Sequence, residues 1–598
     1  MEKTAKKSWT TRAFLISLAV LVLISLVNWG IISGWGNVRI SRVNMIGDNG
    51  MKYSALMYVP QNATNDTPAP AIAMYHGNSG NARNHESWAV EFTRRGFVVI
   101  SVDNLGAGDA EYSEALGRYA VPDQFTKYVL SLPFVDTSRF VTSGHSLGGD
   151  TVVEMTLRYN PAVCLLSNGG AASFVKAEDT YSGNILMLNG LADKLNKVDA
   201  YRETTQQLFV RTGTMSEGES IVPGTLYGSF EGGNANMLVE IPGQIHEGAF
   251  INHDHISQLL DFTQKAIDVP NPIDSNNQIW LWKDIIGQIG MFAFAITMIL
   301  FALLLIEKVP AFACIKQPLP RNIGMRGKDL GISITCAIVF PLISLYTGAF
   351  GLINLLGAQK ASFPLFGLRF TNIALSTIIA LNVFGAIMFV LFHKVWGKKK
   401  FNATIRDYGL TSEGKTGLDW SLIGKSLLLA VIVVTAGWTY MAIQGATLGT
   451  DFYCLFFGFK PIPLFKLHRY LPYLIVWAIC FVVAAVGMNV ERRLPSTGSE
   501  AKDTVIAVIF NVVLAAGTLT AMVLIESAIQ ISIGSSAIAL ASWKTDITRL
   551  WGMPVGMIIG AGGNTYLYRK TGNVWLGAFL MGIIAGLCAC LYGQLQFA

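Results

Sequence analysis

The sequence carries little charge for its length: 14% of its 598 residues are Asp, Glu, Lys or Arg, whereas 52% are hydrophobic. Soluble globular proteins carry about 25% charged residues, so much of this surface must avoid water. The charges are also divided unevenly. Residues 39–274 hold 16 basic and 26 acidic side chains, a net charge of −10, while the remainder has a net charge of +16. Because acidic side chains repel phosphate, we do not expect this region to bind nucleic acid.

Cysteine is scarce as well. Of the seven cysteines, only Cys164 lies between the first long apolar run and Pro270, which excludes a disulfide framework in that region. There is no Cys-x-x-Cys pair, and Cys588 and Cys590 lie within an apolar run, where we interpret them as packing residues. We predict neither a metal site nor a cofactor.

Apolar runs are abundant, and nine have the roughly 20 residues needed to cross a bilayer. The first, Ala13–Ile32, follows a short basic segment. A cleaved signal peptide is the alternative, but the run is long for one and no clear Ala-x-Ala site follows, which favours an uncleaved anchor. The other eight are Ile285–Ile306, Leu330–Leu356, Ile373–Phe392, Trp420–Ile443, Tyr470–Met488, Thr504–Ile525, Trp551–Tyr568 and Val574–Leu595.

Lys and Arg between these runs predict the orientation, because they collect on the cytoplasmic side. With nine spans and a cytoplasmic N-terminus, the inner loops hold most of them, including Lys398–Lys400 and Arg492–Arg493. We therefore predict a multi-pass cell-membrane protein with residues 38–268 and the C-terminus outside the cytoplasm. The stretch Glu526–Ser542 stays ambiguous: it extends the preceding helix, re-enters the membrane or lies at its surface.

The chain divides into four parts by pattern. Residues 1–37 form the cytoplasmic N-terminus and the anchor. Residues 38–268 alternate short apolar runs, Gly/Asn/Asp-rich turns and helical stretches, which is typical of an α/β domain. Residues 269–284 read as a linker, and residues 285–598 as an all-α membrane domain of eight helices.

The stretch "TSGHSLGGD" sets Ser146 between Gly144 and Gly148, after a strand-like run and before an amphipathic helix. This strand–turn–helix context is that of a nucleophilic serine. The turn forces Ser146 into a strained backbone conformation, and the two glycines remove side chains that would clash. The hydroxyl is thereby exposed, with the N–H of Leu147 at the helix N-terminus.

A serine hydroxyl needs a base, and the base needs an orienting carboxylate. Downstream, "NILMLNGLAD" ends a strand at Asp193, and "NMLVEIPGQIHEGAF" ends one before His246, which is the expected order of acid and base. Asp199 is the alternative acid. In "AIAMYHGNSGN" a strand precedes Asn78, whose N–H we pair with that of Leu147 as an oxyanion hole.

The remaining polar residues near these motifs are given structural roles. We expect His145 to be a packed or surface histidine, His76 a hydrogen bonder at a strand end, and Asp103 a turn stabiliser. His253 and His255 suggest zinc, but two histidines without a third ligand indicate a solvated face.

Five motifs occur in the order typical of α/β-hydrolases: "HGNSG", "VDNLGAGDA", "FVDTSRFVTSGHSLGG", "NGLAD" and "PGQIHEGAF". Over about Asn44–Ile267 the chain resembles this superfamily, in particular dienelactone hydrolases and the catalytic domains of prolyl-oligopeptidase-like enzymes. The resemblance implies a parallel-rich sheet flanked by helices, and hydrolysis of an ester or amide through an acyl-enzyme. There is no room for a large lid, although Arg211–Asn234 could edge the site.

The membrane domain is faintly similar to the CAAX-protease and bacteriocin-processing membrane family. That family needs paired glutamates and later histidines, but this chain has Met488, Asn489 and Met581 at those places. If the two are related, the chemistry is lost here, and we expect the helices to hold the hydrolase near the bilayer. The apolar segment Phe452–Phe465 is either a docking surface for the hydrolase or an interfacial loop.

These patterns together predict a membrane-anchored serine hydrolase, which cleaves a free or bilayer-borne ester or amide outside the cytoplasm. The alternative is a membrane transporter or acyltransferase that uses the α/β domain for binding or acyl transfer.

Overall fold

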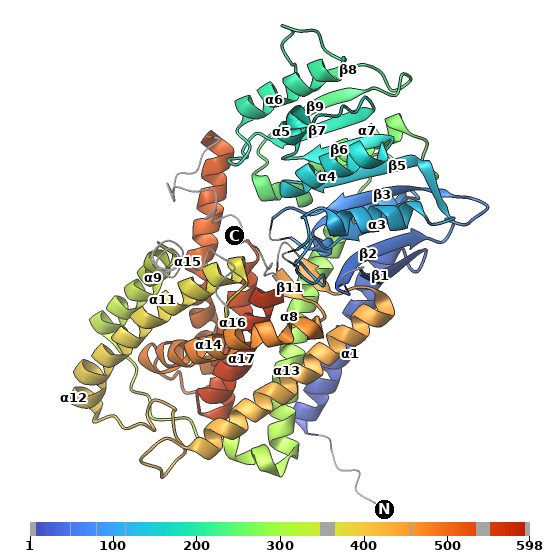
Figure 1. Cartoon of the computed structure of the whole chain (residues 1–598). Coiled ribbons are helices and arrows are strands. Elements are labelled where there is room, and N and C mark those ends of the chain that lie inside the picture. Colours follow the sequence, from blue (N-terminus) through green and yellow to red (C-terminus); the bar gives the residue numbers. More distant parts are fainter. Residues whose placement is uncertain are drawn as a thin grey trace, which may run out of the picture.

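The computed structural model describes residues 8–591 apart from residues 48, 49, 79, 114, 347–364, 455, 456 and 534–550. In Figure 1 a sheet domain lies above a bundle of long helices, and both ends of the sheet domain continue into that bundle. The predicted fold class is confirmed in its architecture: a mostly parallel α/β sheet domain is joined to an all-α domain of apolar helices.

The sheet has nine strands in the order β1-β2-β4-β3-β5-β6-β7-β9-β8. Neighbouring strands from β4 to β9 run parallel, while β1, β2 and β8 add antiparallel strands at the edges. Strands β3, β6 and β7 are buried along their whole length and β5 over its last six residues, as expected for parallel strands covered on both faces. The strands are β1 Val38–Ile46, β2 Lys52–Pro60, β3 Ala69–Tyr75, β4 Val98–Val102, β5 Val135–His145, β6 Val163–Ser167, β7 Asn184–Gly190, β8 Leu226–Tyr227 and β9 Asn236–Ile241.

Helices cover both faces of the sheet and enclose two apolar cores. One core lies under α3, α4, α5 and α6, and the other lies under α2 and α7. The helices are α2 Glu86–Arg94, α3 Ala120–Leu130, α4 Leu147–Tyr159, α5 Ala171–Lys176, α6 Val198–Arg211 and α7 His253–Ala266.

Within the described residues, seven helices are long and apolar enough to cross a membrane, consistent with a multi-pass protein. They are α1 Trp9–Ser33, α8 Trp280–Lys308, α9 Gly327–Tyr346, α11 Arg369–Leu391, α13 Trp420–Leu448, α14 Leu467–Val486 and α15 Glu500–Ile533. Two shorter helices, α16 Met553–Thr571 and α17 Trp575–Leu591, occupy the last two predicted spans. Because α17 is apolar around its whole circumference, it lies buried against α13, α14 and α16.

Several helix boundaries differ from the predicted runs, and two of them bear on the linker and on the ambiguous stretch. Helix α8 begins at Trp280, not at Ile285, and so takes in the end of the predicted linker. Helix α15 runs on to Ile533, so the start of the ambiguous stretch extends the preceding helix. The rest of that stretch, residues 534–542, lies outside the described residues.

The segment between α13 and α14 docks on the sheet domain. It includes the short strands β10 Phe452–Cys454 and β11 Phe457–Phe459, and the rings of Phe452 and Phe459 are fully buried. The hydroxyl of Tyr453 donates to Oδ1 of Asn84, at 3.2 Å, across the boundary between the two domains. The segment therefore contacts the sheet domain through a polar side chain, while its buried aromatic rings belong to the core of the helical domain.

Candidate active site

Ser146 stands at the turn between β5 and α4 with φ 57° and ψ −122°, a backbone conformation that non-glycine residues rarely adopt. The glycine at 148 is required here, because a Cβ atom on it would lie 1.9 Å from the carbonyl oxygen of Tyr75. A Cβ on Gly144 would lie 2.7 Å from the carbonyl oxygen of Gly148. Close packing of the turn against β3 therefore enforces the strain that the sequence predicts.

The three side chains predicted to form one unit are in contact. The Oγ atom of Ser146 lies 2.9 Å from Nε2 of His246, and Nδ1 of His246 lies 2.7 Å from Oδ2 of Asp193. Because a carboxylate only accepts hydrogen bonds, Nδ1 carries the proton and Nε2 accepts from the hydroxyl. The carboxyl ends of the parallel strands β5, β7 and β9 lie on the same side of the sheet. The three residues follow these strand ends and therefore come together.

Asp193 is held by its own turn. Its side chain is fully buried, and its Oδ1 atom accepts the backbone N–H groups of Leu195, at 2.7 Å, and Asn196, at 3.0 Å. Asp199, the alternative acid, has a fully exposed side chain 3.9 Å from Arg202. The structure therefore brings Asp193, and not Asp199, to His246.

A small open pocket surrounds the hydroxyl of Ser146. Asn78 lines it from the end of β3, and Leu147 is the first residue of α4, directly after the serine. The chain at Gly77 passes so close that a Cβ there would lie 2.9 Å from the carbonyl oxygen of His145. Both predicted oxyanion donors thus belong to backbone that borders the serine.

Some residues that line the pocket were not predicted from the sequence. They are Gly77, Gly80, Asn84, Glu247 and Phe250. The sequence could have indicated a structural role for Asn84, because Asn81 and Asn84 form a capping box at the start of the short helix Ala82–His85. None of the lining residues comes from the insert Arg211–Asn234, so the structure does not support its predicted place at the site.

Two structural assignments agree with the sequence analysis. Nδ1 of His76 donates to the carbonyl of Gly77, at 2.7 Å, and Nε2 accepts the N–H of Asn104, at 2.9 Å. Asp103 accepts the N–H groups of Ala82 and Asp109, at 2.7 and 3.0 Å, and thereby fixes two turns.

The solvated face predicted for the "HDH" stretch is wrong for one of its histidines. His255 is buried, and its Nε2 atom lies 3.0 Å from Oγ of Ser167. Helix α7 packs this side against the sheet, and burial lowers the pKa of His255 to about 3. His145 is also buried, and burial together with the neighbouring His246 lowers its pKa well below the usual value.

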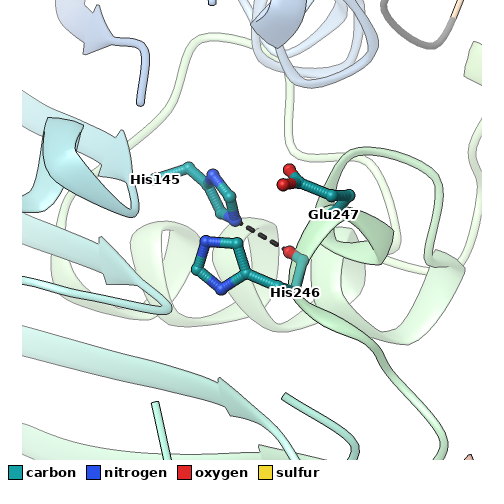
Figure 2. Close-up of side chains that lie close together, drawn as sticks. All are labelled: His145, His246 and Glu247. Atoms are coloured by element: carbon teal, nitrogen blue, oxygen red, sulfur yellow. Dashed lines mark hydrogen bonds between the residues drawn. The ribbon is translucent and has the colours of Figure 1, made fainter. Parts of the chain in front are cut away.

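One group of side chains in the described part of the chain could hold a metal ion: His145, His246 and Glu247, drawn in Figure 2. Its atoms already have other partners. Nε2 of His145 donates to the carbonyl oxygen of His246, at 2.9 Å. Both ring nitrogens of His246 are within hydrogen-bond distance of Ser146 and Asp193. A metal bound to His246 would have to break one of these two hydrogen bonds.

Comparisons of sequence do not place the chain in a known family: neither a family model nor a curated protein matches it. Comparisons of structure find hydrolases. The esterase LipW from Mycobacterium marinum is 14% identical and covers 42% of this chain and 88% of its own, with a TM-score of 0.28. Bacterial heroin esterase is 15% identical and covers 42% and 92%, with a TM-score of 0.29. Esterase 2 of Thermogutta terrifontis is 14% identical and covers 38% and 92%, with a TM-score of 0.28.

At the places where the CAAX-protease family needs ionisable groups, the helical domain has packing contacts. Nδ2 of Asn489 donates to Oδ1 of Asn564, at 3.1 Å, and the side chain of Met581 is fully buried. The resemblance to that family stays a prediction.

Proposed function

We propose that the protein is a membrane-anchored serine hydrolase that cleaves an ester or amide through an acyl-enzyme. The observation that carries the proposal is the pair of contacts from Ser146 to His246 and from His246 to Asp193, at 2.9 and 2.7 Å. A serine, a neutral imidazole and a buried carboxylate in this order make a nucleophile with its base and orienting acid.

The chemistry follows from the positions of the atoms. Oγ of Ser146 attacks the substrate carbonyl carbon while its proton moves to Nε2 of His246. The N–H groups of Asn78 and Leu147 stabilise the negative oxygen of the tetrahedral intermediate. That intermediate expels the alcohol or amine, which takes the proton from Nε2. A water molecule then attacks the acyl carbon and gives a proton to Nε2 of His246. The second tetrahedral intermediate breaks its bond to Oγ of Ser146, which takes the proton back from Nε2, and the carboxylic acid leaves.

The proposed site of action is outside the cytoplasm. The distribution of Lys and Arg supports this orientation, with Lys398–Lys400 and Arg492–Arg493 at the ends of helices on the predicted cytoplasmic side. The substrate is then extracellular or carried by the bilayer itself.

Turnover of a substrate panel by the purified full-length protein tests the proposal. The panel contains p-nitrophenyl esters of increasing chain length and aminoacyl amides, each measured with the wild type and with Ser146→Ala. Hydrolysis that needs Ser146 supports a serine hydrolase. Product formation only when an alcohol is added would instead show an acyltransferase, and solute transport into vesicles by Ser146→Ala would show a transporter.

A further inference from the structure

The chain that follows Asn78 is held by the helical domain at residues 81–84. Asn78 precedes Asn81 by three positions, and Asn81 caps the short helix η1, Ala82–His85. An oxyanion donor is effective only when it is fixed within a few tenths of an ångström of its working position. What holds this turn therefore bears directly on catalysis.

Tyr453 of β10 makes the first contact. Its hydroxyl donates to Oδ1 of Asn84, at 3.2 Å, and the same oxygen accepts the backbone N–H of Asn81, at 2.7 Å. Asn84 also lines the pocket together with Asn78 and Ser146. A hydroxyl of the helical domain is thus two hydrogen bonds from the backbone that continues from Asn78.

Arg83, beside Asn84, makes the second contact. Its Nη2 donates to the carbonyl of Gly449, at 2.7 Å, and its Nε lies 3.1 Å from Oδ2 of Asp451. Its Nη1 also pairs with Glu86 of the sheet domain. Both partners of the Arg83–Asp451 pair are almost completely buried, so neither charge is well solvated without the other. Burial raises the pKa of Asp451, and the positive charge of Arg83 opposes that rise.

Lys466 makes the third contact, on a different loop, the one that follows β4. Its Nζ donates to the carbonyl oxygens of Gly106 and Gly108, at 3.2 and 2.8 Å. The loop that carries these carbonyls is tied to His76 through Asn104, whose N–H donates to Nε2 of His76 and whose Nδ2 donates to its carbonyl, both at 2.9 Å. His76 lies two positions before Asn78, so the chain is held both before and after the predicted donor.

We infer that the helical domain positions the oxyanion hole: Tyr453 acts through Asn84, and Asp451 acts through Arg83, to hold the N–H of Asn78 toward the substrate carbonyl. These are positioning residues, since neither touches the reacting atoms. The inference rests on the proposed serine hydrolase function and deepens it. A single helix such as α1 is enough to anchor a domain, whereas these buried polar contacts hold two loops that border Asn78: the turn at Ala82–His85 and the loop after β4.

The test compares Tyr453→Phe with wild type in the full-length protein, with p-nitrophenyl butyrate as substrate. We expect kcat and the rate of fluorophosphonate labelling to fall about tenfold, less than the loss of a whole oxyanion donor. KM and the unfolding temperature should stay close to wild type. The matched control is Tyr440→Phe, which removes a hydroxyl 2.6 Å from Oγ of Ser25 inside the helical domain and should leave kcat unchanged.

A double-mutant cycle distinguishes a role of Tyr453 in positioning Asn84 from a role in folding stability alone. If Tyr453 acts through Asn84, Tyr453→Phe should cause no further loss of kcat in an Asn84→Ala background. Active-site titration counts the competent molecules. Fewer titratable sites with an unchanged kcat per site would show a merely structural role and overturn the inference, as would additive losses in the cycle.

The inference and the proposed function fail in different ways. A wild type labelled at Ser146, with Tyr453→Phe as fast as wild type, would overturn the inference alone. A wild type that neither labels nor turns over substrate would overturn the proposed function and the inference with it.

Discussion

Oγ of Ser146 and Nε2 of His246 lie 2.9 Å apart, although 100 positions separate the two residues in the chain. The contact depends on two backbone features: the strained turn at the end of β5 and the loop that follows β9. Each of these features places its side chain at the carboxyl ends of the parallel strands. The hydrogen bond leaves the imidazole placed to accept the serine proton as soon as a carbonyl carbon is within reach.

Replacement of Asp193 should remove the orienting acid and leave the fold in place. In Asp193→Asn the amide can donate to Nδ1, which then favours the wrong tautomer of His246, and we expect kcat to fall by about four orders of magnitude. Asp199→Asn is the matched control, because the side chain of Asp199 is fully exposed and its ion-pair partner, Arg202, lies 3.9 Å away. Steady-state kinetics of both variants decide the matter. A large loss in Asp199→Asn with normal rates in Asp193→Asn would reverse the assignment.

The nucleophile turn should not tolerate a single added methyl group at position 148. Gly148→Ala would bring a Cβ to 1.9 Å from the backbone of Tyr75, so the turn and Ser146 must shift. Displacement by about 1 Å costs on the order of 100-fold in rate, and we expect at least this loss of kcat. Gly117→Ala, where a Cβ meets nothing within 4 Å, should be as active as wild type. Equal activities in the two variants would contradict the packing argument.

The sequence predicted the three facing side chains because each belongs to a short motif at the end of a strand. Parallel strands bring those ends together whatever the details of the loops. The contact from Tyr453 to Asn84 was not predictable in this way, since the two residues lie 369 positions apart in different domains. Nothing in either local pattern specifies how the domains dock.

The start of α8 illustrates the same limit. Lys283 and Asp284 read as the polar end of a linker, but the structure buries both and places Nζ of Lys283 3.6 Å from Glu86. Because these charges are paired at the domain interface, the helix can begin before the apolar run, with both charged residues in its first turns. The prediction for His255 was wrong for a related reason: two histidines without a third ligand indicated a solvated helix face, but the sheet covers this one.

The orientation of the protein is open to a direct test in intact cells. Asn65→Cys lies in an exposed loop of the sheet domain and should react with a membrane-impermeant thiol reagent. Lys399→Cys lies at the predicted cytoplasmic end of its helix and should react only after the cells are permeabilised. The native Cys314 is exposed, lies on the predicted cytoplasmic side and should label only after permeabilisation as well. The opposite labelling pattern would overturn the predicted topology.

Acid should destabilise the sheet domain through its buried histidines. Burial lowers the pKa of His85 and His255 to about 3, so below pH 6.5 the unfolded chain binds protons that the folded chain does not. For each histidine, the free energy of unfolding therefore decreases as the pH falls from 6.5 toward 3. The decrease is about 2 kcal/mol at pH 5. Unfolding followed by tryptophan fluorescence between pH 5 and 8 measures this slope.

His85→Phe provides the matched variant for that measurement. Both ring nitrogens of His85 are buried without hydrogen-bond partners, and the ring packs against Trp88 and Phe250, so phenylalanine should fit. We expect a shallower loss of stability at low pH in this variant. His253→Phe, at a half-exposed position, should retain the wild-type slope. An unchanged slope in His85→Phe would contradict the assignment.

The most direct test of the central claim is covalent labelling of the purified full-length protein with a fluorophosphonate, followed by peptide mass mapping. The account predicts one label per molecule, on Oγ of Ser146, and none in Ser146→Ala. His246→Ala should label slower by orders of magnitude, because Ser146 then lacks its base. A wild type that stays unlabelled, or a Ser146→Ala variant that labels as fast as wild type, would contradict the account.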